Sequence, residues 1–246
     1  MDRLIYTAAT GAKHILEQQA TTSNNLANLS TTGFRAQLDT FRAVPVVSEG
    51  LPTRAFVVDN TVGADFTAGP VQATGRDLDV AIKGPGWIAV QTQDGTEAYT
   101  RNGSLQISPN GILQTANGQT VMGEGGPIAI PPNTTVSVGK DGSIASLTTD
   151  TVPATSTIVG RIKLVNPDQK QLVRGDDGFF RMQDGSSAQA DPAVTVTSGA
   201  LEGSNVSAVD SMVNMISLAR SLETQMSLLK NAENNAAKAT QILALS

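Results

Sequence analysis

Asp77 and Asp79 are the residues that come nearest to acid–base chemistry, because they lie two apart where the chain favours a β-strand. Side chains two apart on a strand share a face. A carboxylate pair on one face is the arrangement that glycan hydrolysis uses, for instance on peptidoglycan. Sharing a face does not bring two carboxylates to one substrate, and the spacing nominates no further carboxylate. We therefore predict no catalytic residue and no enzymatic activity.

The other reactive residue types are scarce. His14 is the only histidine and falls inside a helical pattern, where a lone histidine is usually a surface or packing residue. No cysteine is present, which removes disulfides, thiolate catalysis and cysteine metal sites. Gly84-Pro85-Gly86 lacks the third glycine of a dinucleotide motif, and Asp141-Gly142-Ser143 lacks the full calcium ligand series. We read both as turns and predict no metal and no cofactor.

Charge and hydropathy narrow the possible partners. The 246 residues carry a net charge of −5 and no basic run, so nucleic acid is not an expected partner. No segment approaches the roughly 20 apolar residues that span a bilayer, so we expect no membrane insertion. The first 30 residues lack the unbroken apolar core of a secretory signal. If the protein is exported, we expect this to occur without a cleaved signal peptide.

The two ends of the chain share an apolar seam at helical spacing. Steps of three and four residues are typical of helices that lie along other helices. The N-terminal seam contains Ile5, Ala8, Ala12, Ile15, Gln19, Thr22, Leu26 and Leu29, and the C-terminal seam contains Met215, Ala219, Leu222, Met226 and Leu229. Proline is absent from both segments, as long helices require.

The middle of the chain favours β structure. All eleven prolines fall there, and short β-branched runs are separated by seven Asp-Gly or Asn-Gly pairs, which suit tight hairpin turns. The first four pairs recur every seven or eight residues, which predicts a meander of short strands. The fold class is therefore α+β. We expect a discontinuous coiled-coil-like helical domain of residues 1–34 and 201–246, an extended linker or hairpin at 35–75, and a central antiparallel all-β domain at 76–200.

The terminal helices carry few charges. Residues 1–40 contain 15 Ser, Thr, Asn or Gln against 6 charged residues, and residues 201–246 contain 16 against 7. Neutral polar groups can enter a helix contact without the large desolvation penalty of an ion. An ordinary intramolecular helix pair also fits this pattern. Because the seam includes several alanines, we expect the pair to be marginally stable and partly disordered until neighbouring subunits cover it.

Local sequence signals mark where the helices end. Gly33 fits a left-handed cap after the first helix. Asn205 or Ser207 fits the N-cap of the second, with Asp210 favourably placed in the first turn.

Three motifs carry a resemblance to a known family. They are Ser23-Asn24-Asn25-Leu26-Ala27-Asn28 with Thr32-Gly33-Phe34, then Leu78-Asp79-Val80-Ala81-Ile82-Lys83-Gly84 with Tyr99-Thr100-Arg101-Asn102-Gly103, and finally Leu201-Glu202-Gly203-Ser204-Asn205-Val206. In this order they resemble bacterial flagellar axial proteins of the rod and hook. The resemblance implies a structural subunit of the basal-body rod, a hollow helical shaft that crosses the periplasm and transmits torque. It also implies as partners copies of this chain, other rod proteins and the flagellar type III export apparatus.

We predict that assembly contacts involve seam residues and the polar residues around them. The set is Ile5, Ile15, Asn24, Asn25, Leu26, Asn28, Leu29, Asn205, Met215, Arg220, Leu222, Glu223, Met226 and Leu229. Arg220 and Glu223 lie three apart and could pair within their helix or between subunits. The alternative reading is a secreted β-rich adhesin or fibre module with coiled-coil ends, which gives no reason for the paired terminal motifs.

Overall fold

The structure, a computed structural model, describes residues 2–45, 55–148 and 155–244. For residues 2–7, 42–45, 55–62, 236 and 239–244 it describes the backbone alone. The chain forms two compact units. The helical unit comprises residues 1–28, 37–63 and 206–246, and the β unit comprises residues 29–36 and 64–205. Each is described separately.

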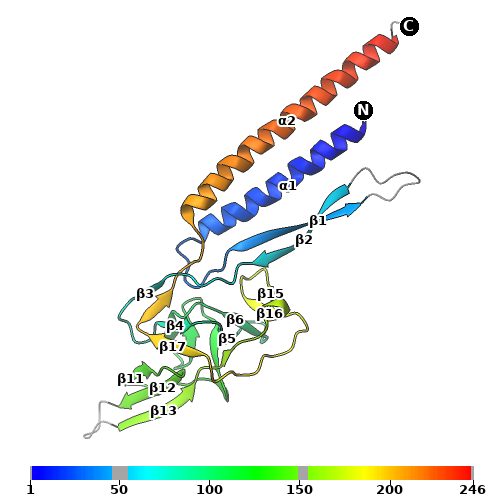
Figure 1. The fold of residues 1–246 in the computed structure, drawn as a ribbon. Helices are drawn as coiled ribbons and strands as arrows, with labels where there is room; N and C mark the ends of the chain where they lie inside the picture. Colours follow the sequence, from blue (N-terminus) through cyan, green and yellow to red (C-terminus); the bar gives the residue numbers. More distant parts are fainter. Residues whose placement is uncertain (1, 46–54, 149–154, 245–246) are drawn as a thin grey trace. The chain divides into compact units, whose positions relative to one another are not determined.

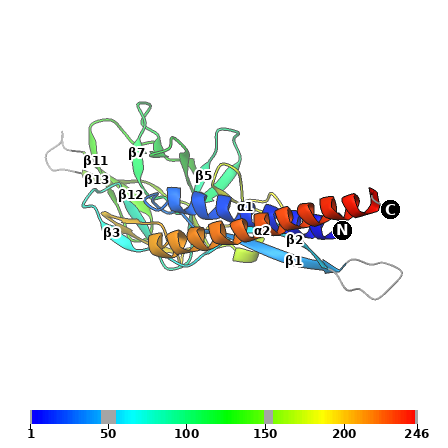
Figure 2. The ribbon, with the colours of Figure 1, turned by 90° about the horizontal axis from the view of Figure 1, so that it is seen from above.

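Two long helices dominate the helical unit. Helix α1 (Asp2–Ala27) and helix α2 (Ala208–Ala244) lie side by side and antiparallel, and the longer α2 extends past the first residues of α1 (Figures 1 and 2). The less exposed positions of α2 recur at alternating steps of three and four residues. They are Ala208, Ser211, Met215, Leu218, Leu222, Gln225, Leu229 and Ala232, and Ala219 beside Leu218 is also partly buried. This spacing is that of a coiled-coil seam.

A second face of α1 packs on the long β-ribbon of the same unit. Strands β1 (Gln37–Pro45) and β2 (Ala55–Ala64) form a two-stranded sheet. The His14 ring packs edge-on against Phe41, with ring centroids 5.7 Å apart. Farther along the helix, the Thr21 hydroxyl donates a hydrogen bond to the Asp39 carboxylate at 2.7 Å. Helix α1 therefore contacts α2 on one side and β1 on another.

The β unit is entirely antiparallel, and its largest sheet has nine strands. Its continuous path runs β15 (Leu172–Arg174), β16 (Phe180–Met182), β6 (Glu97–Thr100), β5 (Trp87–Gln91), β9 (Thr120–Gly123), β8 (Leu113–Thr115) and β7 (Leu105–Ile107). Strand β10 (Gly126–Pro127) pairs with β9, and β14 (Leu164–Val165) pairs with β5. The α+β fold class predicted from the sequence is confirmed.

Smaller sheets complete the β unit. Strands β11 (Thr134–Val138), β12 (Ser143–Thr148) and β13 (Thr155–Arg161) form one of three strands. Strand β17 (Thr195–Ser198) pairs with β4 (Val80–Lys83), and β18 (Ala200–Glu202) pairs with β3 (Val71–Ala73). A short 3-10 helix, η1 (Gln169–Gln171), precedes β15.

The core of the β unit has two parts. The larger is aliphatic, and Val80, Ile88, Val90, Leu105, Leu113, Val121 and Ile144 are fully buried within it. The smaller is aromatic, built on Trp87, Tyr99 and Phe180. Burial raises the pKa of the Tyr99 hydroxyl to about 12, and this hydroxyl accepts a hydrogen bond from the Ala188 backbone N–H at 2.6 Å.

The Asp-Gly and Asn-Gly turns differ from the predicted form. Six of the seven glycines have positive φ, but Asn133 is the only non-glycine residue with positive φ in the described ranges. A two-residue type I′ turn needs positive φ at both central residues. At Gly118 the backbone N–H instead donates to Thr115 O at 2.9 Å, which makes the glycine the fourth residue of a turn. This is a type I turn followed by a left-handed glycine.

The predicted meander is correct only in part. Strands β7, β8 and β9 follow one another, but β6 does not pair with β7, because β6 lies between β5 and β16 and the meander joins the sheet through the pairing of β9 with β5. The Asn102-Gly103 pair is not a hairpin turn. A Cβ on Gly103 would lie 1.6 Å from the Val80 carbonyl oxygen, so this glycine permits a close backbone approach instead.

Gly33 was expected to cap the first helix, and this is wrong. Helix α1 already ends at Ala27. Gly33 does adopt the left-handed conformation, with φ of 69°. It lies against the backbone of Arg101 and Asn102, and a Cβ there would come within 2.3 Å of the Arg101 carbonyl carbon. Close packing of two chain segments explains this glycine.

Candidate assembly interface

The α1–α2 seam contains most of the predicted apolar residues. Ile15 and Leu26 on α1 are partly buried, as are the α2 residues Met215, Leu222 and Leu229. Small residues let the helices approach at the centre, since a Cβ on Gly11 would lie 3.4 Å from the Gln225 side chain. The predicted residue Ile5 lies outside the side chains that the structure describes. The seam thus holds the two terminal helices of one chain together.

The observed seam differs from the predicted one at two positions. Met226 is 56% exposed and lies off the seam, where Gln225 takes its place. Leu29 is 38% exposed and lies beyond the end of α1. The predicted step from Leu222 to Met226 is the one that fails, because the partly buried positions run from Leu218 and Ala219 through Leu222 to Gln225. Met226 therefore belongs to the free surface of α2.

The asparagines of the N-terminal motif make contacts within the chain. The Asn25 side chain donates to Gln37 O at 2.9 Å and accepts from Gln37 N–H at 2.8 Å, which ties α1 to the start of β1. Asn28 donates to the Asn24 carbonyl oxygen at 2.9 Å and so satisfies a group at the helix end. The exposed Asn24 side chain lies 3.4 Å from the Asn28 amide.

Asn205 joins three segments of the β unit rather than capping α2. Its side-chain oxygen accepts from Ala36 N–H at 2.7 Å, and its amide donates to Asp65 O at 2.9 Å and Thr67 O at 3.1 Å. The cap of α2 is the alternative candidate, Ser207, whose hydroxyl accepts from the Asp210 N–H at 3.3 Å. Asp210 lies in the first turn, as predicted.

The outer face of α2, opposite the seam, carries an apolar patch that the sequence pattern did not single out. Four large apolar side chains within eight residues are more than half exposed. They are Val209 at 71%, Met212 at 53%, Val213 at 59% and Ile216 at 55%, and we call them the outer patch. A surface helix that also packs on a partner normally carries polar residues on its free face. Apolar side chains gathered there mark a contact surface.

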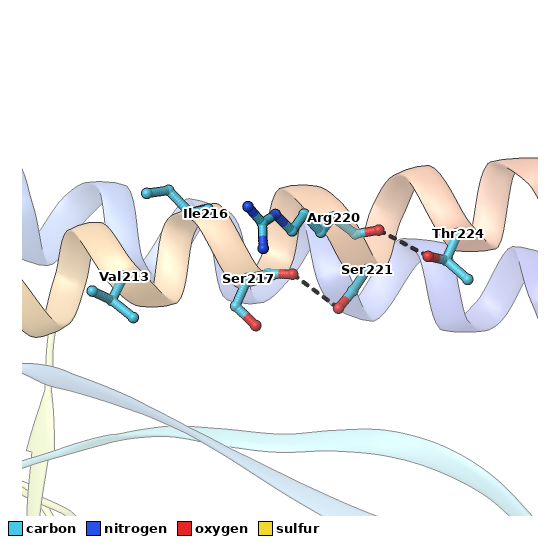
Figure 3. Close-up of a pocket in the computed structure, with 6 residues that line it drawn as sticks. All are labelled: Val213, Ile216, Ser217, Arg220, Ser221 and Thr224. Carbon is cyan, nitrogen blue, oxygen red and sulfur yellow. Dashed lines mark hydrogen bonds between the residues drawn. The ribbon is translucent and has the colours of Figure 1, made fainter.

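A shallow groove of about 340 Å³ continues the outer patch along α2. Figure 3 shows its lining residues on successive turns: Val213, Ile216, Ser217, Arg220, Ser221 and Thr224. The Ser221 and Thr224 hydroxyls donate to backbone carbonyls one turn earlier, at 2.9 and 3.0 Å. With these hydroxyls bonded to its own backbone, the helix presents a mostly neutral surface.

Arg220 and Glu223 are both exposed on this helix. Within the described residues neither forms an ion pair, so pairing inside the helix, one of the two predicted options, is absent there. On α1 the free face carries Leu16, which is 52% exposed. Beside it, Lys13 and Glu17 form a pair at 3.4 Å.

A buried ion cluster lies within the β unit where the sequence predicted no site. Glu202 is 1% exposed and pairs with Arg35 at 2.7 Å and Arg101 at 2.9 Å. Its carboxylate also accepts from Gly69 N–H at 3.0 Å. We call Arg35, Arg101 and Glu202 the junction triad, because Arg35 directly follows the N-terminal motif, and Arg101 and Glu202 belong to the central and C-terminal motifs. The triad fixes the segments from which both helices depart.

The aspartates offered for catalysis do not converge. Asp77 is exposed, whereas Asp79 is buried and pairs with Arg76 at 3.1 Å. Across the described residues, no cluster of three or more His, Asp or Glu side chains could hold a metal ion. None of the helices in that part of the chain is long and apolar enough to span a bilayer.

Comparison with known proteins agrees with the three motifs. Residues 5–35 match the family model described as flagella basal body rod protein, residues 81–146 the flagellar hook protein FlgE/F/G D1 domain, and residues 197–242 the flagellar basal body rod FlgEFG protein C-terminal region. The chain is 49% identical to the flagellar basal-body rod protein FlgF of Escherichia coli and 46% identical to that of Salmonella typhimurium, over the full length of each. It is 26% identical to the rod protein FlgG of Bacillus subtilis over 95% of this chain and 96% of the relative.

Proposed function

This chain belongs to the FlgF family of flagellar basal-body rod proteins, and we propose that it assembles into the rod through the free faces of α1 and α2. The family makes it a structural subunit of the basal body. The fibre-module alternative finds no support in the relatives, all of which are rod proteins. The higher identity to FlgF than to FlgG supports a place in the proximal rather than the distal rod.

The observation that carries this proposal is the outer patch. The α1–α2 seam is already occupied within one chain, so a neighbour has to use another surface. Burial of a whole aliphatic side chain contributes about 1.5–3 kcal/mol, and side chains already half covered contribute about half of that. Four such side chains from the outer patch supply several kcal/mol to one contact. This contribution favours subunit addition only where a neighbour presents a complementary surface, and other contacts must add to it, because association itself costs several kcal/mol.

The geometry of assembly follows from using different surfaces on the two partners. A contact between unlike faces that does not close into a ring repeats as a helix, which is the symmetry of a rod. Nearly parallel helices in such an array bury many small side chains at once and resist twisting. Arg220 and Glu223, free within their own helix, are placed to pair with charges on a neighbour. An exposed pair of this kind contributes about 0.2–1 kcal/mol, so it helps orientation more than affinity.

The remaining roles follow from this assignment. We place the protein in the part of the rod that crosses the periplasm and expect it to reach that site through the flagellar type III export apparatus. Its partners are copies of itself and other rod proteins, and it performs no enzymatic reaction. A thin helix pair suits this route, since it can pass a narrow channel unfolded and order on arrival.

The test is incorporation of an outer-patch variant into basal bodies. In a host strain lacking its own copy, Ile216→Asp is expected to abolish incorporation and motility, because it puts a charge into the subunit contact. Ile216→Leu, the matched control, keeps an apolar side chain and retains both. Fluorescence of the buried Trp87 in the purified variant establishes that the β unit is folded. Normal incorporation of folded Ile216→Asp would refute the proposal.

A further inference from the structure

A second cavity, of about 200 Å³, lies wholly within the β unit, and the proposed assembly does not use it. Residues 84–86, the loop residues Asn166 and Pro167, and Gln169 at the start of η1 form part of its wall. The rest includes the aromatic side chains of Phe66 and Trp87 and the guanidinium-bearing residue Arg101. Small-molecule and peptide pockets have this make-up, with apolar walls and a few fixed polar groups.

Arg101 is fixed in this wall. Its side chain is 5% exposed. One terminal nitrogen, Nη1, donates to Glu202 at 2.9 Å, and the other, Nη2, donates to the Gly84 carbonyl oxygen on the pocket wall at 2.8 Å. The guanidinium carbon lies 5.4 Å from the centre of the Trp87 ring. Its Nε atom is buried without a hydrogen-bond partner among the described residues.

The buried charges beside the pocket are two arginines and one carboxylate, whereas Asp168, between the lining residues Pro167 and Gln169, is exposed. The single carboxylate of Glu202 is shared between Arg35 and Arg101. A third arginine, Arg174, donates to Arg35 O at 2.9 Å and lies 4.6 Å from the Phe34 ring centre. No carboxylate of the described residues lies within ion-pair distance of Arg174. Burial lowers the pKa of both Arg101 and Arg174, which is the expected cost of cations without enough anions.

A buried cation is stabilised when an anion and further hydrogen bonds reach it. The pocket lining places the positive charge of Arg101 beside the aromatic rings of Phe66 and Trp87. A carboxylate on a short apolar stem fits this combination, because the stem can pack on Phe66 and Trp87 while the oxygens face Arg101.

We propose that this pocket binds a carboxylate carried on a short apolar stem, either the side chain of an acidic residue in a partner polypeptide or a small organic acid. The site is distinct from the helical faces. Its ligand bridges the wall at residues 84–86 and the segment at 166–169. Occupancy would supply the anion that the arginine-rich junction lacks.

The experiment uses the fluorescence of Trp87, the only tryptophan in the chain. The purified full-length protein is titrated with glutarate and, separately, with a short peptide containing one glutamate and blocked ends. Glutaramide, a neutral molecule of the same shape, and sodium chloride at matched ionic strength serve as controls. We expect a saturable change in Trp87 fluorescence with at least one acid and none with the controls.

Two variants locate the site without touching the junction triad. Gln169 lines the pocket and is exposed, so Gln169→Glu adds a competing negative charge and should weaken acid binding about tenfold. Gln171→Glu makes the same change in the same short helix outside the pocket lining and should leave binding unchanged. Binding of the peptide alone assigns the ligand to a partner polypeptide, and binding of glutarate alone assigns it to a free acid. Equal response to glutaramide, no saturable response, or equal affinity in both variants would overturn the proposal.

Discussion

We expect the replacement of Glu202 by glutamine to cause a large loss of stability in the β unit. The substitution keeps the shape of the side chain but removes the carboxylate that, among the described residues, pairs with both Arg35 and Arg101, whose side chains are 0% and 5% exposed. Removing one partner of a buried ion pair typically costs about 3–5 kcal/mol, because the remaining charge is left unpaired. The glutamine oxygen can still accept one hydrogen bond. We therefore expect a loss near the lower value, about 3 kcal/mol of unfolding free energy.

Urea denaturation followed by Trp87 fluorescence measures this loss directly, because Trp87 is buried in the β unit. With a urea dependence of about 2 kcal/mol per molar, the midpoint should fall by about 1.5 M. The matched control is Glu124→Gln. Glu124 is 52% exposed and lies 3.6 Å from Arg161, so its pair should contribute no more than about 0.5 kcal/mol. Equal midpoints for Glu202→Gln and Glu124→Gln would refute the role of the triad.

Three further predictions follow from other parts of the structure. Leu222→Asp puts a charge into the α1–α2 seam, so the helical circular dichroism signal should weaken while the urea midpoint followed by Trp87 fluorescence stays unchanged. A fall in both the helical signal and the midpoint would show that the two units do not fold separately. Gly33→Ala adds a Cβ 2.3 Å from the Arg101 carbonyl carbon at positive φ and should cost more than about 2 kcal/mol of unfolding free energy, against a negligible change for Gly125→Ala, where nothing lies within 4 Å. Because the pKa of Tyr99 is about 12 in the folded protein and 10 in the unfolded chain, the stability that its buried hydroxyl contributes is complete below pH 10 and is lost as the pH rises toward about 12. Between pH 9 and 12 the unfolding free energy of the wild type should therefore fall by about 2 kcal/mol more than that of Tyr99→Phe. Equal losses in the two proteins would contradict the pKa shift.

The helical ends and the β character of the middle could be predicted because they are local properties. Steps of three and four residues place Ile15 and Leu26 on one face of a helix whatever lies around them. Pairs such as Asn117-Gly118 predict where the chain turns, because Asn and Gly tolerate backbone conformations that other residues avoid. These features need no knowledge of the rest of the fold.

The outer patch and the strand order could not be read in the same way. Apolar residues from Val209 to Ile216 surround the helix, so periodicity alone does not say which face meets α1. Pairing of β5 with β9 joins residues about 30 positions apart along the chain, which turn spacing does not reveal.

The junction triad was missed for a related reason. Glu202 and Arg101 are 101 residues apart, and no spacing rule connects them. A signal was nonetheless present at Glu202, the single charged residue of the C-terminal motif Leu201–Val206. A charged residue inside an otherwise neutral motif is a reasonable candidate for a buried ion pair.

The most direct test of assembly through the outer patch is the reactivity of one thiol in the finished rod. The chain contains no cysteine, so Ile216→Cys introduces a unique thiol at a side chain that is 55% exposed in the single chain. Its maleimide labelling rate is measured in the purified monomer and in isolated basal bodies. We predict rapid labelling of the monomer and strong protection in the basal body, where a neighbouring subunit covers α2. Equal labelling rates in the two states would contradict the account.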